Sequence, residues 1–263
     1  MIDFFKYQGT GNDFIIIDNR ELSFDSSNVK LVSFLCDRRF GIGGDGLMLL
    51  ENHSEHDFTM RYFNSDGNEA SMCGNGGRCI AAFAVEQGII STPDNFSFMA
   101  VDGNHHAAYD NGIVSLKMID VTTVDIQDNY NFLNTGSPHY VTFTNNINAI
   151  NIVEEGKAIR YSDTFKPDGT NVNFVQLLDG NNISVRTYER GVEDETFSCG
   201  TGVVASAISA HLKKPDLMNF NIKIKGGALR VHFTIEEPLI FKDIWLVGAA
   251  TFVFKGQIQN PST

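Results

Sequence analysis

One short motif occurs twice in the chain, and this duplication constrains the fold more than any other feature. Residues 72–79 read MCGNGGRC and residues 198–204 read SCGTGVV. In both, a cysteine (Cys73 or Cys199) precedes glycine, a small polar residue and a second glycine, and a helix of small residues follows. A single Cys-Gly-x-Gly helix start would be a weak signal, whereas two in one chain indicate repeated structural units.

Further segments recur in the same order around the two motifs. TGNDFIII (10–17) matches TGSPHYVTF (135–143), since both are a turn that runs into a strand. FTMRYFN (58–64) matches ISVRTYER (183–190), since both alternate as strands do. Hairpin signals across a glycine-containing turn follow each helix. We therefore predict two homologous halves of β-rich α+β structure, each with a helix that begins at its cysteine, joined near residue 118.

Capping signals predict four main helices among these strands. The expected ranges are 28–39, 79–87, 146–153 and 201–213. Glycine or lysine residues end the helix that follows each cysteine motif, as is typical of helix C-termini.

GIGGDG at residues 41–46 matches the dinucleotide-binding pattern G-x-G-x-x-G letter for letter. That pattern must follow a strand and open a helix. Here a helical segment precedes it and a strand follows, so the segment does not predict nucleotide binding. The loop can still line a site.

Composition excludes several classes of protein. With 263 residues, the chain is long enough for one large domain or two of ordinary size. The formal net charge of −12 and the lack of basic clusters argue against nucleic-acid and anionic-membrane partners. No apolar run reaches transmembrane length, and the N-terminus has no signal-peptide pattern. Four cysteines do not make a disulfide scaffold here, so we expect a cytoplasmic protein with reduced thiols.

Three chemistries could explain the two cysteines. Redox thiols usually lie close in sequence, as in C-x-x-C, whereas Cys73 and Cys199 lie one in each half. Zinc needs more ligands at close spacing, and Cys73 and Cys79 are too far apart for a zinc knuckle, so we expect no metal. In acid–base catalysis, one thiolate removes a proton from a carbon and a thiol on the opposite face returns one. This third interpretation explains more of the pattern.

The position of both cysteines at helix N-termini favours the acid–base interpretation. Free backbone N–H groups and the positive end of the helix dipole favour anions there, and they favour thiolate over thiol. The same N–H groups can bind a substrate carboxylate and stabilise the enolate-like charge that develops on it. The glycines would let the backbone approach that carboxylate closely.

Together these motifs resemble the diaminopimelate epimerase family, a group of amino-acid epimerases that do not use pyridoxal phosphate. The resemblance runs nearly end to end, and the two cysteine segments together with YERG are its most specific part. The segments that carry it are GTGNDF (9–14), FNSDGNEASMCGNGGRC (63–79), GSPH (136–139), NVNF (171–174) and, within 188–202, YERG and FSCGTG.

The resemblance implies an α+β fold of two pseudo-symmetric domains, each a β-sheet or barrel around a central helix, with the active site between them. Residues 1–118 would form the half with Cys73, and residues 119–250 the half with Cys199. The final strand, at about 251–258, would return to the first half. The implied reaction is epimerisation of LL-2,6-diaminopimelate to meso-diaminopimelate without a cofactor, in lysine and peptidoglycan precursor biosynthesis. The implied partner is this small molecule, and the chain could act as a homodimer.

The resemblance also implies roles for single residues. Cys73 and Cys199 would be the acid/base thiols, with His139 tuning Cys73 and Glu189 tuning Cys199 and contacting substrate. The reacting α-carboxylate would be held by the backbones of Gly74, Asn75, Gly200 and Thr201. Asn12 would lie close by. The distal amino and carboxylate groups would be bound by the side chains of Asn64, Asn173 and Arg190.

Two positions depart from the family pattern. Ser137 stands in GSPH where many members have Asn, and Gly46 stands where some have Gln, so neither side-chain role is carried over. Cys36 and Cys79 are interpreted as core residues.

Two rival hypotheses remain open. Proline racemase-like enzymes also use two cysteines in duplicated halves, although the residues that would bind distal groups favour a substrate with a second charged end. From another class, the chain could be a redox thiol pair or a non-catalytic amino-acid binder.

Overall fold

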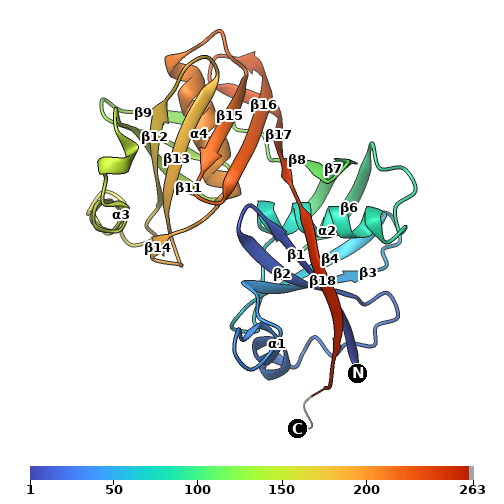
Figure 1. The fold of residues 1–263 in the computed structure, drawn as a ribbon. Coiled ribbons are helices and arrows are strands. Elements are labelled where there is room, and N and C mark those ends of the chain that lie inside the picture. The colour runs from blue at the N-terminus through green and yellow to red at the C-terminus, as the bar shows by residue number, and fades with distance from the viewer. Residues whose placement is uncertain (261–263) are drawn as a thin grey trace. The chain divides into compact units, whose positions relative to one another are not determined.

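The computed structural model describes residues 1–260, and the chain folds into two compact units. The first unit comprises Met1–Leu116 and the C-terminal segment from Gly248, and the second comprises Lys117–Val247. Figure 1 shows that each unit consists mainly of strands, with one long helix among them.

The first unit contains a mixed sheet and two helices. Its elements are β1 (Ile2–Gly9), β2 (Asn12–Asp18), α1 (Val29–Cys36), β3 (Gly46–Glu51), β4 (Phe58–Asn64), β5 (Glu69–Ala70), α2 (Gly74–Glu86), β6 (Phe96–Ala100), β7 (Gly103–Asp110), β8 (Ile113–Lys117) and β18 (Thr251–Ile258). The strands pair in the order β18-β1-β2-β3-β4-β6-β7-β8, and β5 pairs with β4. The last strand of the chain thus lies beside the first.

The second unit has corresponding elements. They are β9 (Val124–Ile126), β10 (Asn131–Asn134), β11 (Pro138–Phe143), the 3-10 helix η1 (Ile147–Ala149), α3 (Ile152–Arg160), β12 (Asn171–Leu177), β13 (Asn182–Glu189), β14 (Asp194–Glu195), α4 (Gly200–Lys213), β15 (Asn219–Ile224), β16 (Gly227–Glu237) and β17 (Ile240–Ala249). The strands pair in the order β9-β10-β11-β12-β13-β15-β16, with β17 beside β16 and β14 beside β13.

Both units repeat one pattern of strand pairings. In the first, β1–β2 is antiparallel, β2–β3 parallel, β3–β4 antiparallel and β4–β6 parallel. In the second, β10–β11, β11–β12, β12–β13 and β13–β15 follow the same sequence of directions. β18 pairs with β1 as β9 pairs with β10. The predicted fold class, α+β with two β-rich halves each built on one helix, is confirmed.

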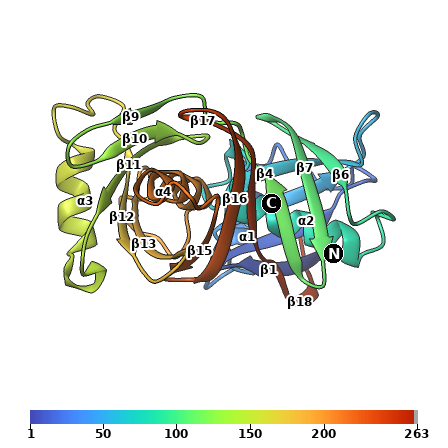
Figure 2. The same cartoon turned by 90° about the horizontal axis from the view of Figure 1, so that it is seen from above.

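The two cysteine motifs open the central helices of the units. Residues 74–84 of α2 and residues 202–211 of α4 are all buried. Figure 2 views α4 nearly end-on, with strands of its own unit around it. Gly and Ala are frequent in α2, and Gly, Ala and Ser are frequent in α4, so their small side chains let strands pack closely on every side. Burial on all sides fixes the position of each helix N-terminus.

Three predicted helices are present with shifted ends, and one prediction is wrong. The range 79–87 begins too late, because Gly77 N donates to Cys73 O at 2.8 Å and the glycine-rich stretch is already helical. At 146–153 the chain forms only the turn η1, and α3 begins at Ile152. Asn151 caps α3 by accepting from Glu154 N, which places the helix start later than the sequence pattern suggested.

Candidate active site

Cys73 is the N-cap of α2. Its backbone is extended, with φ −102° and ψ 147°, and its sulfur accepts a hydrogen bond from Gly76 N at 3.2 Å. A Cβ at Gly76 would lie 3.3 Å from the Cys73 sulfur and 3.3 Å from the sulfur of Met48. Glycine at this position therefore leaves room for the half-buried thiol against the helix N-terminus.

A buried cation lies behind this thiol. The guanidinium of Arg78 is fully buried and donates to Gly74 O at 3.3 Å, Thr10 Oγ1 at 3.2 Å and Asn75 Oδ1 at 3.1 Å. Among residues 1–260, no carboxylate forms an ion pair with Arg78. Burial lowers the pKa of Arg78, while the neighbouring side chains of Cys79 and Cys73 oppose that shift. Arginine keeps its charge in proteins, so the first turn of α2 carries a fixed positive charge.

The β1–β2 hairpin brings Asn12 to the same helix end. Thr10 and Gly11 form its turn with positive φ values of 53° and 86°, as a type I′ turn requires. Asn75 donates through Nδ2 to Asn12 Oδ1 at 3.1 Å. The structure therefore joins three predicted site residues, Cys73, Asn75 and Asn12, within the first unit.

Asn64 and Gly46 form a backbone pair between β4 and β3. Asn64 ends its strand with an exposed side chain. At Gly46 a Cβ would come within 2.5 Å of the Tyr62 ring and 2.6 Å of Phe63 O, so the fold accepts only glycine there. Steric contact with Tyr62 and Phe63 therefore explains why this chain has glycine at position 46.

Cys199 is the N-cap of α4, at the place that Cys73 occupies on α2. Its side chain makes no capping bond, and its sulfur lies 3.6 Å from Thr201 Oγ1. A Cβ at Gly202 would lie 3.3 Å from this sulfur and 2.4 Å from Asn173 Oδ1. Gly202 thus provides space for the second thiol as Gly76 does for the first.

His139 is fully buried beside the start of α4. Its Nε2 lies 2.9 Å from Thr201 Oγ1 and 3.0 Å from Ser137 Oγ. Burial lowers the pKa of His139 to about 3, and the nearby charge of Arg190 acts in the same direction. The imidazole is therefore neutral at physiological pH. The structure places His139 in the unit of Cys199, and its predicted action on Cys73 stays a prediction.

Asn173 lies inside the second unit, where both its amide nitrogen and its amide oxygen form hydrogen bonds. Its Nδ2 donates to Tyr140 O at 3.1 Å and lies 3.0 Å from His139 Nδ1, while its Oδ1 accepts from Thr187 at 2.9 Å. The side chain is completely buried. These contacts orient His139, and within this unit they do not present the Asn173 amide at a surface.

Asn171 is the site residue that the sequence reasoning missed. Its Nδ2 donates to Ser137 Oγ at 3.1 Å, and its Oδ1 accepts from Arg190 N at 2.9 Å. It thereby links two positions that the sequence had singled out. The signal was available in NVNF, because Asn171 and Asn173 lie two apart on one face of β12.

Glu189 and Arg190 lie at the end of β13, and both are partly buried. The guanidinium of Arg190 donates to Asp168 O at 3.3 Å. No carboxylate in the described part of the chain pairs with it. Arg190 therefore retains a charge that an anionic ligand could neutralise.

The other two cysteines belong to the core. Cys36 and Cys79 are buried, and burial is the main cause that raises their pKa, to about 12 for Cys36. Both remain protonated at neutral pH. Their interpretation as core residues agrees with this environment.

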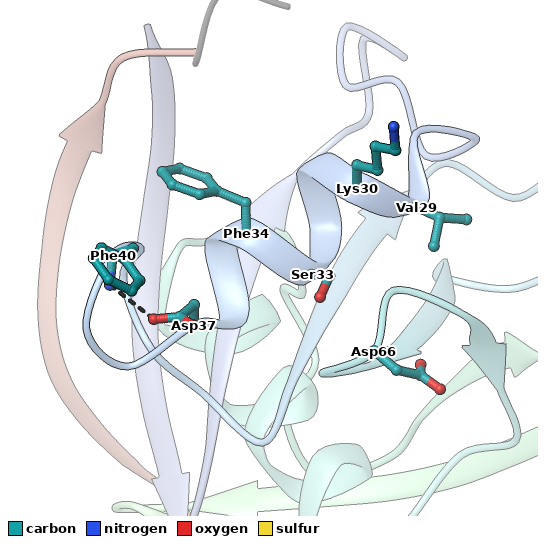
Figure 3. A pocket seen from close by; sticks show the side chains of 7 residues that line it. All are labelled: Val29, Lys30, Ser33, Phe34, Asp37, Phe40 and Asp66. Atoms are coloured by element: carbon teal, nitrogen blue, oxygen red, sulfur yellow. Dashed lines mark hydrogen bonds between the residues drawn. The ribbon is translucent and has the colours of Figure 1, made fainter.

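A surface pocket lies elsewhere, beside α1 in the first unit (Figure 3). Its lining residues are Val29, Lys30, Ser33, Phe34, Asp37, Phe40 and Asp66. It includes no thiol and no predicted site residue, so the chemistry of the helix N-termini outweighs its hollow shape as a guide to the active site. No cluster of three or more His, Cys, Asp or Glu side chains within residues 1–260 could hold a metal ion. None of the described helices is long and apolar enough to cross a membrane.

Comparisons with known proteins identify the family. The sequence profile of diaminopimelate epimerase matches residues 4–115 and 131–253. The diaminopimelate epimerase of Flavobacterium psychrophilum is 53% identical over 97% of this chain and 99% of that protein. The one of Aquifex aeolicus is 39% identical over 98% of both. A Bacillus anthracis phenazine biosynthesis protein of the PhzF family shares the fold, with a TM-score of 0.75 and 15% identity over 98% of this chain and 99% of that one. The chain belongs to the diaminopimelate epimerase family.

Proposed function

We propose that the chain epimerises LL-2,6-diaminopimelate to meso-diaminopimelate through two thiols, Cys73 and Cys199, without a cofactor. The observation that carries this proposal is the equivalence of the two thiols. Each is the N-cap of the central helix of its unit, and each lies against the second glycine of a Cys-Gly-x-Gly motif. Membership of the family and the identity to the Flavobacterium psychrophilum protein support the same reaction.

The proposed chemistry moves one proton off the substrate and another onto it. The thiolate of one cysteine takes the α-proton, so that the C–H bond breaks and an S–H bond forms. The electron pair delocalises into the α-carboxylate as an enolate-like anion. The thiol of the other cysteine then gives its proton to the opposite face of the carbon. No electrons are exchanged, and the net change is inversion at one centre.

The helix starts supply the stabilisation that this anion needs. Backbone N–H groups of Gly74 and Asn75 on α2, and of Gly200 and Thr201 on α4, are the proposed donors to the α-carboxylate. The buried charge of Arg78 adds to the positive potential of α2. These donors are fixed in the folded protein, so little reorganisation is required during the reaction.

The distal end of the substrate needs its own contacts. We assign the distal carboxylate to Arg190, which is positioned by Asn171 and has no carboxylate partner within residues 1–260. Asn64 is retained as a proposed contact for the distal groups because its side chain is exposed at the end of β4. Asn173 is retained as a proposed contact for the distal groups, and its amide also orients His139. Glu189 and His139 are retained as the groups that tune the thiols.

The same proposal covers location and assembly. A cytoplasmic location with reduced thiols is proposed because four cysteines do not make a disulfide scaffold in a chain of 263 residues. A homodimer is proposed because β18 exposes three consecutive large apolar side chains, Phe252, Val253 and Phe254. Light scattering of the purified protein would show a mass of two chains.

Turnover of the stereochemically pure substrate tests the function. The purified chain, with no added cofactor, is incubated with LL-diaminopimelate, and the isomers are separated by chiral chromatography. In deuterium oxide, the α-position should also exchange. A racemase acting on proline would show exchange with proline instead. A redox protein or an amino-acid binder would show no exchange with either, which would overturn the proposal.

A further inference from the structure

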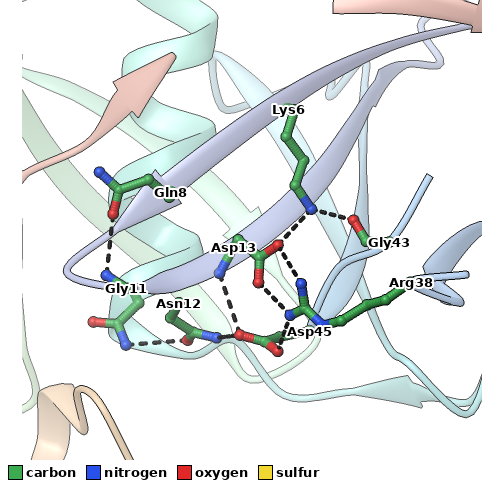
Figure 4. Close-up of polar contacts among 9 residues, drawn as sticks. Lys6, Gln8, Gly11, Asn12, Asp13, Arg38, Gly43 and Asp45 are labelled. Carbon is green, nitrogen blue, oxygen red and sulfur yellow. Dashed lines mark hydrogen bonds and ion pairs between the residues drawn. The ribbon is translucent and has the colours of Figure 1, made fainter. Parts of the chain in front are cut away.

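The GIGGDG loop contacts the β1–β2 hairpin through Asp45. Its backbone N donates to Asp13 O at 2.8 Å, and its Oδ2 accepts from Asp13 N at 3.2 Å. The same Oδ2 accepts from Asn12 Nδ2 at 2.5 Å. Figure 4 shows these side chains converging at the end of the hairpin. The loop thus reaches a residue of the proposed substrate site.

Two cations hold this arrangement in place. Arg38 donates through Nη2 to Asp45 Oδ1 at 2.7 Å and forms a two-pronged pair with Asp13, at 2.5 and 3.0 Å. Lys6 lies 2.6 Å from Asp13 and also bonds to Gly43 O. Burial alone would raise the pKa of Asp13, but the bonds and charges of Arg38 and Lys6 outweigh it and lower the pKa to about 2. Asp13 is therefore ionised at neutral pH and is held by both cations.

The chemistry at both ends determines how two amides are oriented. A carboxylate only accepts hydrogen bonds, so Asn12 must turn its amino group toward Asp45. Its oxygen then accepts from the amino group of Asn75. The oxygen of Asn75 in turn faces Arg78, which only donates. The donors point in one direction from Arg78 to Asp45, and each end independently requires the same orientation.

We propose that Asp45 is a positioning residue that orients the Asn12 amide toward a substrate carboxylate. The amino group of Asn12 carries two N–H bonds, and Asp45 accepts one of them, so the other can donate to an anion. A flipped amide would present its oxygen to that anion instead and repel it. This inference rests on the proposed function, since it takes Asn12 to lie at the substrate.

A double-mutant cycle tests the proposal. Asp45→Asn replaces a charged, obligate acceptor by a neutral group that can also donate, so only the Arg78 end still holds the Asn12 amide in its orientation. We expect kcat/KM for diaminopimelate to fall on the order of tenfold. If Asp45 acts through Asn12, the same change made on an Asn12→Ala background should alter kcat/KM by less than about twofold. Asp45 is 43% exposed, so the variant is expected to fold.

Asp18→Asn is the matched control. Asp18 is also paired with an arginine of the first unit, Arg20, at 2.7 Å, but it lies at the far end of β2 from Asn12. Its change should leave kcat/KM at the wild-type value. Full additivity of Asp45→Asn and Asn12→Ala would overturn the positioning role, as would an unchanged kcat/KM in the Asp45→Asn single variant.

A second measurement does not depend on turnover and separates this inference from the proposed function. The side-chain amide protons of Asn12 are identified in nitrogen-edited spectra by their loss in Asn12→Ala. The proton bonded to Asp45 should exchange slowly with water in the wild type and faster in Asp45→Asn. Equal exchange in the two proteins would overturn the orienting role even if the enzyme epimerises diaminopimelate. A wild type without epimerase activity but with this difference would overturn the function alone.

Discussion

His139 Nε2 lies 2.9 Å from the hydroxyl of Thr201, and this contact joins the buried ring to the first turn of α4. The Asn173 oxygen accepts from Thr187, so its amino group is what faces His139 Nδ1. Nδ1 is then the acceptor, and the neutral ring carries its proton on Nε2. That proton faces the hydroxyls of Thr201 and Ser137, at 2.9 and 3.0 Å, so Nε2 does not accept from Thr201. The Thr201 hydroxyl can then donate toward the sulfur of Cys199, 3.6 Å away.

Thr201→Val should therefore remove a hydrogen bond that stabilises the thiolate form of Cys199. Valine keeps the shape and the backbone N–H but removes the hydroxyl. Loss of one hydrogen bond to an ionised group predicts a fall in kcat on the order of tenfold. The pH at which iodoacetamide alkylates Cys199, followed by peptide mass spectrometry, should shift to a higher value. Thr201→Ser keeps a hydroxyl, so its kcat and its pH dependence of alkylation should match those of the wild type. An unchanged alkylation profile in Thr201→Val would contradict the role of the hydroxyl.

The pKa of His139 predicts how stability depends on pH. In the unfolded chain this imidazole takes up a proton near pH 6.5, whereas in the folded protein it does so only near pH 3. Between these values the unfolded state binds more protons, so this contribution to stability is complete above pH 6.5 and is lost as the pH falls toward 3. Urea midpoints measured from pH 7.5 to 4.5 should fall less steeply in His139→Gln. His106→Gln, at an exposed histidine, should keep the wild-type slope.

The two thiols should be individually essential. Cys73→Ala and Cys199→Ala each remove a proton carrier from one face, so each should abolish formation of meso-diaminopimelate. Cys36→Ala provides the control, because this thiol is buried and its raised pKa keeps it protonated. It should retain turnover with some loss of stability. A single cysteine variant at position 73 or 199 with near-wild-type turnover would rule out the two-base mechanism.

Equivalent glycines in the two motifs should tolerate substitution differently. In Gly202→Ala the new Cβ would lie 2.4 Å from Asn173 Oδ1, so the amide that orients His139 must move. We expect a loss of about 1–3 kcal/mol in the free energy of unfolding. In Gly76→Ala the nearest atoms, at 3.3 Å, are the side-chain sulfurs of Cys73 and Met48, which can adjust. Urea unfolding of both variants should rank Gly202→Ala as the less stable, and the reverse order would be inconsistent with these contacts.

Much of the fold could be predicted from the sequence because duplication is a property of the sequence. Repeated cysteine motifs, strand alternation and the order of landmarks led to two α+β halves with central helices. The ends of the helices were harder to predict from the sequence. A run such as GNGG has low helix propensity, yet Cys73 caps it and the surrounding strands bury it. Tertiary packing therefore overrides local preference at the start of α2.

For the candidate site, sequence patterns identify residues only where they act alone. Motif and position predict Cys73 and Cys199 as the acid/base thiols. Asn171 and Asp45 act through partners far away in sequence, and no local pattern shows that Asn171 bonds to Arg190 or that Asp45 bonds to Asn12. Such roles depend on the register of neighbouring strands and on loop geometry.

Substrate specificity should depend on Arg190. Its guanidinium has no carboxylate partner among the described residues, and Asn171 holds its backbone, so a distal substrate carboxylate can pair with it. A planar guanidinium binds a carboxylate through two parallel bonds, and lysine cannot reproduce this geometry. Arg190→Lys should therefore lose most of kcat/KM for diaminopimelate while Cys73 and Cys199 remain alkylatable.

The wild type provides the complementary comparison. Lysine lacks the distal carboxylate, so binding it would leave Arg190 desolvated and unpaired, and its kcat/KM should be far below that for diaminopimelate. Proline has no second charged end and should be turned over no better. Arg186→Lys is a suitable control variant, because Arg186 is already paired with Glu195 at 2.7 Å within the same unit and should not affect the ranking. Equal kcat/KM values for the three substrates, or a preference for proline, would mean that Arg190 does not read a distal carboxylate.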